Sequence, residues 1–233
     1  MSTYASLANT LTYRLGNRTD LGLTTDASAR IHEFLFAGSV ELAHRLKGLG
    51  VRIPQLESRF DYVIPANTDD VTYATLLASG RLYAIVDIVN RTGEIPMNFS
   101  AIEAFEKTRA DGATGSADQV TLWTSYNRVL SVWRKPTENT TVRILSYLDP
   151  AAITAPSSQS PEVGVSYEAG LLLLAESFAW DSLDNEEKAD SAEAKFDRWI
   201  TRKRAPTEHE RRNPRTRGLR PHPAMIRDHD LGI

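Results

Sequence analysis

The histidines are the side chains that could most readily bind a metal ion or carry a proton at neutral pH. The 233-residue chain has five of them and no cysteine. His32 precedes Glu33, but Phe36 stands where a metalloprotease helix needs its second histidine. His32 and His44 are separated on one predicted helix by about 18 Å, given the helical rise, so they cannot share an ion. We therefore expect no metal site and no thiolate chemistry.

Phosphate-binding and nucleophile motifs are the second kind of chemistry that a sequence can reveal. Gly48 and Gly50 follow a predicted helix and lack the third glycine of a dinucleotide-binding turn. The loop after Gly112 has no P-loop lysine, and the chain contains no Gly-x-Ser-x-Gly elbow. Adjacent carboxylates such as Asp69 and Asp70 are typical of turns. The sequence favours a protein with no catalytic residues and no cofactor.

Charge is distributed unevenly along the chain. The formal net charge is −3, yet the last 32 residues carry nine basic and four acidic side chains. That segment is therefore +5, and the preceding residues are −8. Its basic residues include Arg202, Arg204, Arg211, Arg212, Arg215, Arg217 and Arg220. Four prolines rule out a continuous helix beyond Arg204, so we expect an extended tail.

Three interpretations of this basic tail stay open. It could be a solvated end of no particular function. It could be an arm whose arginines meet nucleic-acid phosphates, although it has no aromatic residue for base stacking. It could also be a docking peptide that becomes ordered on a partner. The apolar residues among its last charges favour docking: Met225, Ile226, Leu231 and Ile233.

Helices are predicted at both ends of the part of the chain that precedes the tail. Apolar spacings of three and four indicate helices over 3–17 and from about 26 to 47. After a Pro- and Ser-rich linker, a helix beginning near 167 is apolar on several sides, and a last helix should open at Asp184 with Glu187 as a capping pair. The apolar run in the former supplies candidates for a subunit interface: Leu171, Leu172, Leu173 and Leu174. It is too short to span a membrane.

The intervening segment has the composition of strands. Alternating or β-rich runs predict extended structure over 60–64, 71–77, 82–89, 120–123, 128–133 and 141–148. Ser100 with Glu103 resembles a capping box that opens a short helix over 101–109. The segment Pro136 to Asn139 is predicted to be a hairpin-type connection.

These elements predict an α+β protein in which the two helical pairs bury their apolar stripes against each other. The result would be a four-helix body with a β-rich inserted lobe and an extended C-terminal tail. The predicted parts are a helix pair over 1–58, the insert over 59–150, the second helix pair over 151–204 and the tail over 205–233.

In this layout the chain resembles the head–tail adaptor proteins of tailed bacteriophages, also called head-completion or connector proteins. LANTLTYRLGNRTD and ARIHEFLFAGSVELAHR are similar to the paired N-terminal helices of that family, and FDYVIPANTDDV is similar to its strand that ends at a proline. VLSVWRKPTENTTVRILSYLDPAAI resembles its β-hairpin, and SYEAGLLLLAESFAWDSLDNEEKADSAEAKFDRWI its closing helix pair. The loop 111–118 and the long basic tail depart from the pattern.

The resemblance implies a non-enzymatic virion protein of the head–tail neck, assembled in the host cytoplasm. It would form a ring, usually of twelve copies, between the portal protein and the tail or neck proteins. DNA would pass through the ring without sequence readout. The C-terminal segment would reach along the portal or a neighbouring subunit, which places that role on residues 202–233. The competing hypothesis is a nucleic-acid-binding protein that uses its basic C-terminal arm.

Overall fold

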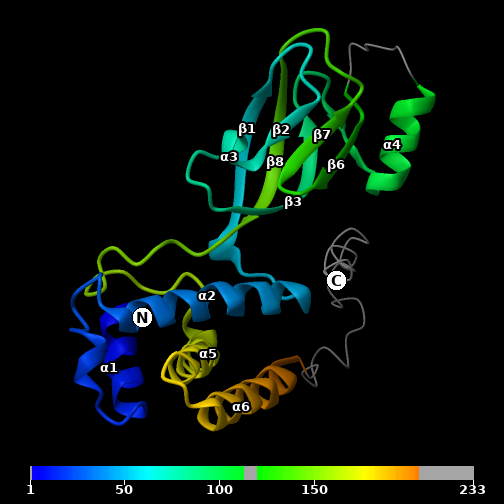
Figure 1. The fold of residues 1–233 in the computed structure, drawn as a ribbon. Coiled ribbons are helices and arrows are strands. Elements are labelled where there is room, and N and C mark those ends of the chain that lie inside the picture. The colour runs from blue at the N-terminus through cyan, green and yellow to red at the C-terminus, as the bar shows by residue number, and fades with distance from the viewer. Residues whose placement is uncertain (1, 113–119, 205–233) are drawn as a thin grey trace, which may run out of the picture. The chain divides into compact units, whose positions relative to one another are not determined.

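The computed structural model describes residues 2–112 and 120–204, and it is an α+β structure, which confirms the predicted fold class. These residues form six α-helices and two four-stranded sheets (Figure 1). They divide into two compact units. The helical unit comprises residues 2–55 and 150–204, and the β unit comprises residues 56–149 without 113–119.

The helical unit takes two helices from each side of the β segment. Their bounds are α1 Tyr4–Arg14, α2 Arg30–Gly48, α5 Glu168–Asp181 and α6 Glu186–Arg204, with single 3-10 turns at Thr19–Leu21, Pro54–Leu56 and Val165–Tyr167. Thr3 caps α1, because its side chain accepts a hydrogen bond from the Ser6 amide at 3.3 Å. The four predicted helices are thus present, and their bounds differ from the predicted ones by a few residues; α1, for example, ends at Arg14 and α2 begins at Arg30.

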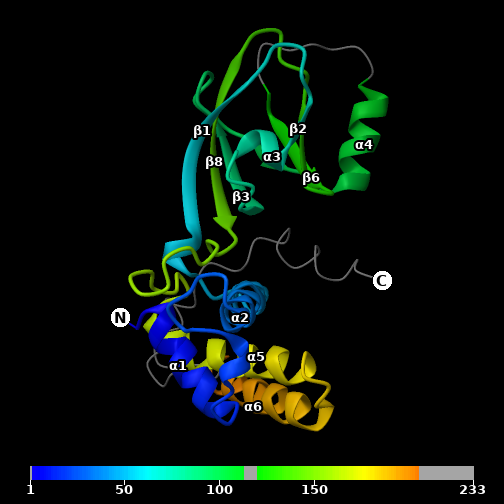
Figure 2. The same ribbon diagram turned by 60° about the vertical axis from the view of Figure 1, so that its left-hand side comes forward.

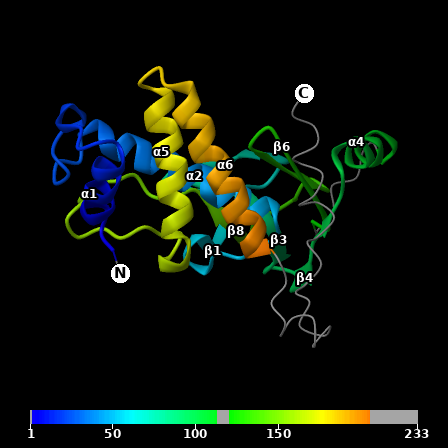
Figure 3. The same cartoon turned by 90° about the horizontal axis from the view of Figure 1, so that it is seen from below.

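Helix α5 is the centre of the helical unit and packs against α1, α2 and α6. Figure 3 shows it beside α6. Two glycines permit the close approach. A Cβ at Gly38 of α2 would lie 3.0 Å from the backbone nitrogen of Ala175, and one at Gly170 of α5 would overlap the Trp199 ring of α6. This packing explains why α5 is apolar on more than one side, as its sequence indicates.

The first sheet of the β unit is antiparallel, with strand order β1-β8-β3-β4. Its strands are β1 Glu57–Ile64, β8 Thr140–Leu148, β3 Leu82–Asn90 and β4 Ile95–Pro96. The β1–β8 register is continuous from Glu57 opposite Tyr147 to Ile64 opposite Thr140. The register on the other side of β8 shifts twice along β3. Strand β1 therefore forms a regular outer strand of this sheet.

The second sheet has the order β2-β7-β6-β5. Its strands are β2 Asp70–Thr72, β7 Val129–Trp133, β6 Leu122–Tyr126 and β5 Asn98–Phe99. β5 and β6 run parallel, so the chain between them must cross over, and helix α4 Ile102–Asp111 lies in this connection. A one-turn helix, α3 Tyr73–Leu76, follows β2.

One core serves both sheets. Its buried side chains come from the first sheet, among them Ile64, Val142 and Ile144, and from the second, among them Trp123 and Leu130. Helix α4 packs on the other face of the second sheet (Figures 1 and 2): its only buried side chain is Phe105, and Gly112 at its end approaches Trp133. Phe105 thus anchors a helix that is otherwise polar.

The strand pairing corrects two sequence predictions. Residues 136–139 do not form a hairpin, because β7 pairs with β2 and β6 whereas β8 pairs with β1 and β3. This connection passes from one sheet to the other. The predicted extended piece 71–77 is a strand only as far as Thr72, whose side chain then caps α3 by accepting from the Thr75 amide at 3.3 Å.

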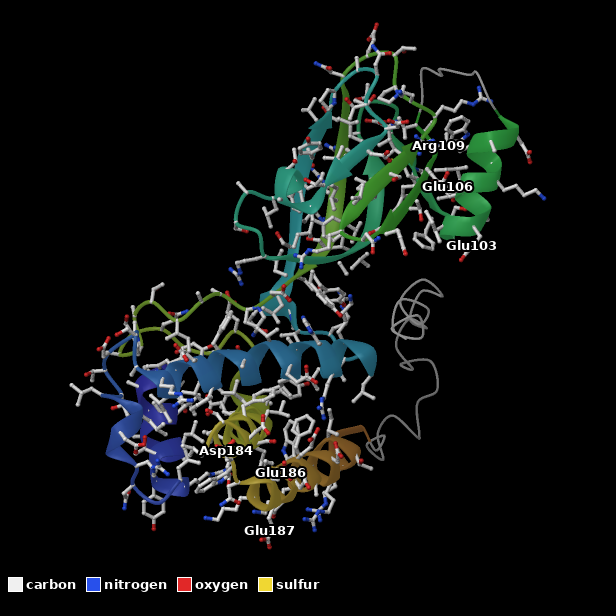
Figure 4. The ribbon with its side chains drawn as sticks, viewed as in Figure 1. Glu103, Glu106, Arg109, Asp184, Glu186 and Glu187 are labelled. Carbon is white, nitrogen blue, oxygen red and sulfur yellow. The ribbon has the colours of Figure 1, made fainter. Side chains whose placement is uncertain are left out.

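Two predicted helix caps are also wrong. Figure 4 labels Glu103, Asp184 and Glu187, which the sequence analysis placed in these caps. Ser100, the predicted cap of α4, does not cap the helix, because its hydroxyl donates to the Ala101 carbonyl. The residue directly before α4 is Ala101, and its side chain makes no capping hydrogen bond. Helix α6 is capped by Asn185, whose Oδ1 accepts from the Lys188 amide at 3.2 Å. Asp184, the predicted cap, has a φ of 54° and lies in the preceding turn.

Candidate functional site

The structure describes only the start of the predicted partner-binding tail. Arg202 is exposed in the last turn of α6, and Arg204 is the final residue of that helix. The other predicted residues lie outside the described part of the chain: Arg211, Arg212, Arg215, Arg217, Arg220, Met225, Ile226, Leu231 and Ile233. The basic segment therefore continues directly from the C-terminal end of α6.

The predicted subunit-interface leucines lie inside the helical unit. Leu171, Leu172 and Leu174 expose 0%, 7% and 2% of their surface, and Leu173 is half-buried. Helix α5 carries all four and packs against three other helices of the same chain. The apolarity of the run is explained by this packing and does not require a second subunit.

Arg45 is the centre of a charged cluster of the helical unit. Its guanidinium lies 2.6 Å from Glu41, 2.9 Å from Glu193 and 3.6 Å from Asp197, and it stacks 5.1 Å from the centre of the Phe196 ring. Partial burial lowers the pKa of Arg45, but the hydrogen bonds to Glu41 and Glu193 and the attraction of their charges together more than offset this, so its pKa is raised. The cluster joins α2 to α6.

Arg109 is the centre of a charged cluster in the β unit. It projects from α4 (Figure 4) and donates to Asp69 at 2.8 Å, with Asp70 at 3.9 Å and Glu106 at 3.8 Å. Asp70 also accepts a 2.5 Å hydrogen bond from the Ser131 hydroxyl. These contacts tie α4 to the start of β2 and to β7, so the cluster positions elements of the fold.

Three buried polar atoms have no hydrogen-bond partner among the described residues: His32 Nδ1, Trp123 Nε1 and Thr124 Oγ1. His32 exposes 2% of its surface, and its Nε2 lies 2.9 Å from the Thr24 carbonyl. Because a carbonyl only accepts, Nε2 must carry the proton and Nδ1 is an unpartnered acceptor. Burial lowers the pKa of His32, against opposing effects of Thr24 and Asp26.

The exposed outer side of β1 is the surface feature that sequence inspection missed. Asp61 accepts two hydrogen bonds from Arg143 of β8, at 2.7 and 2.9 Å, which lower the pKa of Asp61. Arg59 and Val63 are exposed on the same side, Val63 by 49%. The alternation of residues 59–64 revealed a strand, but no local signal shows that the strand lies at the edge of its sheet.

Comparisons with protein families and with curated proteins find no match to this chain. Within residues 2–112 and 120–204, no three His, Asp or Glu side chains are grouped so that they could hold a metal ion. None of the helices in those ranges combines the length and apolarity of a membrane span. The charged clusters around Arg45 and Arg109 join elements of the fold to one another.

Proposed function

We propose that this chain is a structural head–tail adaptor of a tailed bacteriophage. The observation that carries the proposal is the order of its parts, because two helices before the β unit and two helices after it form one packed unit. This supports the finer description of a four-helix body with an inserted β lobe; the extended tail over 205–233 lies outside the described residues and stays a prediction. It also agrees with the paired helices that the sequence resemblance implies, although the segment likened to a hairpin joins two sheets.

In this proposal the protein acts by binding other proteins and carries out no reaction. The helical body takes part in a ring of identical copies between the portal and the tail, and the C-terminal segment docks on the portal or on a neighbouring copy. The rest of the chain carries −8 against +5 in the last 32 residues. A net negative body suits a duct through which DNA must slide without being held.

The test is binding to the portal ring of the same virus by the full chain and by a chain that ends at residue 204. Both should fold, as judged by circular dichroism, because the shortened chain keeps all four packed helices α1, α2, α5 and α6. We expect the full chain to sediment with the portal and the shortened chain to remain free. Equal binding by both would contradict the docking role of the tail.

Two sets of substitutions separate portal docking from nucleic-acid binding, the competing function that the +5 tail favours. The docking hypothesis predicts loss of portal binding when the four apolar residues Met225, Ile226, Leu231 and Ile233 are changed to serine. The nucleic-acid hypothesis predicts that glutamine at the five arginines between 211 and 220 abolishes duplex binding, which weakens steeply with salt in the parent chain. An electrophoretic shift at two salt concentrations measures the latter.

A further inference from the structure

We propose that strand β1 is a self-pairing edge, which joins antiparallel to β1 of a second copy of this chain across a two-fold axis. The first sheet would then continue from one copy into the other. The proposal concerns the free protein and does not rest on its assembly into a phage neck.

The backbone of β1 is available on one side. All eight residues of the strand pair with β8, and within residues 2–112 and 120–204 no strand pairs with the opposite edge. Figure 2 shows β1 at the margin of its sheet, beside β8. The amides and carbonyls along such an edge are a template for another strand. The pairing with β8 contains no bulge that would twist this edge away.

The side chains of β1 alternate between the core and the outer face. Phe60, Tyr62 and Ile64 belong to the core side, whereas Arg59 and Asp61 are exposed on the outer face. Arg59 forms no ion pair among the described residues, and Asp61 is bound to Arg143. The strand thus carries a cation, Arg59, and an anion, Asp61, two residues apart on its outer face. In an antiparallel copy of the strand the order of these two charges is reversed, so each charge can face its opposite.

Electrostatics selects one register for this pairing. A two-fold axis through Phe60 keeps core faces together and places Arg59 of each copy directly opposite Asp61 of the other, so the contact contains two ion pairs. An axis through Asp61 would oppose two carboxylates. An axis through Arg59 would oppose two guanidinium groups and would also set Glu57 against Asp61. A shift of one residue would mix the core and outer faces.

The existing bond between Asp61 and Arg143 is compatible with this arrangement. A carboxylate has two oxygens and about four lone-pair sites, so Asp61 can accept from Arg143 of its own copy and from Arg59 of the second. Charged residues on edge strands generally discourage pairing. Here the opposite charges of Arg59 and Asp61 attract each other across an axis through Phe60. With the axis through Arg59 or through Asp61, like charges face each other and repel. The charges therefore specify the partner, a second copy in one register.

The test measures self-association of the full chain by sedimentation velocity over a range of concentrations. We expect a monomer–dimer equilibrium that Arg59→Glu and Asp61→Arg each weaken by roughly tenfold or more, because each change creates two like-charge contacts across the axis. Lys107→Glu, the same change of charge as Arg59→Glu at an exposed residue of α4, should leave the equilibrium unchanged. A monomer at all concentrations would overturn the proposal, as would an oligomer that Arg59→Glu does not weaken.

Mixing the two charge-reversed variants gives a sharper result. In a mixed dimer the introduced glutamate faces the introduced arginine, and the native Asp61 faces the native Arg59. We therefore expect the Arg59→Glu and Asp61→Arg chains to associate with each other at concentrations where each alone is monomeric. Absence of the mixed dimer, while both variants keep the melting curve of the parent chain, would contradict the register.

Cysteine crosslinking measures the position of the axis independently, since the chain has no native cysteine. Residue 60 of each copy lies opposite residue 60 of the other, with Cα atoms about 4.5–5.5 Å apart, which suits a disulfide. Phe60→Cys should form a crosslinked dimer under mild oxidation, and the exposed Val63→Cys should not. Faster crosslinking at residue 63 than at residue 60 would overturn the proposed axis.

Discussion

His32 is the described residue that should make the stability of the folded chain depend on pH near neutrality. Burial lowers its pKa in the folded state, so the unfolded chain binds a proton more readily. Its contribution to the free energy of unfolding is therefore complete above the unfolded pKa of about 6.5 and is lost as the pH falls below that value. We expect the melting temperature of the helical unit to fall between pH 7.5 and pH 5.5.

The His32→Gln variant isolates this effect. A glutamine amide can still donate to the Thr24 carbonyl but has no proton to gain in this range. The melting temperature of the variant should change less with pH than that of the parent chain, as measured by circular dichroism. An identical pH dependence in both chains would show that other groups cause it. Asp26, whose pKa is lowered by hydrogen bonds from Ser28, titrates at lower pH and would not account for it.

Residue types revealed where helices begin and end only to within a few positions. The sequence analysis predicted Asp184 as the cap of α6, but the next residue, Asn185, belongs to the same residue class that favours this position. The structure uses Asn185 and places Asp184 in the left-handed region. The preceding turn, which returns the chain from α5, decides between them, and a pattern of residue types does not describe that turn.

At the scale of elements, the α2–α5 contact is the packing most sensitive to added volume. A Cβ at Gly38 would meet the Ala175 nitrogen at 3.0 Å and the Leu171 carbonyl oxygen at 3.2 Å. Backbone atoms cannot rotate away, so Gly38→Ala should lower the free energy of unfolding by about 1–3 kcal/mol. Gly48→Ala, at the exposed end of the same helix, should be neutral or raise it by up to about 1 kcal/mol. Urea titrations of both variants measure the difference.

Helix α4 should detach locally when its single anchor is removed. Phe105 is fully buried, whereas the rest of the ten-residue helix is exposed or half-buried, and an isolated helix of this length is marginal in water. Phe105→Ala should cost about 3–5 kcal/mol and accelerate hydrogen exchange throughout 102–111. Lys107→Ala is the matched control on the exposed face. Unchanged exchange of α4 in Phe105→Ala would mean that the Arg109 cluster alone holds the helix.

The positions of the strands were easier to predict than the pairing between them. Alternation and β-branched residues marked six of the eight strands of the described residues in or near their observed positions, although the run 71–77 is a strand only as far as Thr72; β4 and β5, of two residues each, carry no such signal. Strand pairing joins residues far apart in sequence, and a short loop such as 136–139 is compatible with a hairpin or with a change of sheet. The hydrophobic pattern alone does not decide between these outcomes.

At the scale of the whole molecule, the two units should respond separately to destabilisation. Each has its own buried core, centred on α5 in one and between two sheets in the other. In differential scanning calorimetry, Gly38→Ala should lower the temperature of one transition and Phe105→Ala that of another. If each variant instead shifted the whole endotherm by the same amount, the units would unfold as one cooperative system.

The Arg45 cluster and the surroundings of the α5 leucines could be predicted only in part from the sequence, because both depend on contacts between residues far apart in the chain. The spacing of Glu41 and Arg45 is a recognisable helix pair, but Glu193, which completes the cluster, lies on a helix from the other end of the chain. The leucine run of α5 was correctly identified as apolar on several sides. Its neighbours proved to be helices of the same chain, a fact that composition does not contain.

The split origin of the helical unit also has a consequence for synthesis on the ribosome. Helix α2 packs against α5, yet the whole segment 56–149 is translated between them. At about 5–20 residues per second, the ribosome needs roughly 7–27 s to extend the chain from the end of α2 at Gly48 to the end of α5 at Asp181. The apolar stripe of α2 has no α5 to pack against during that time. During that interval the nascent chain exposes a surface that a chaperone can bind, while the β unit behind it is free to fold first.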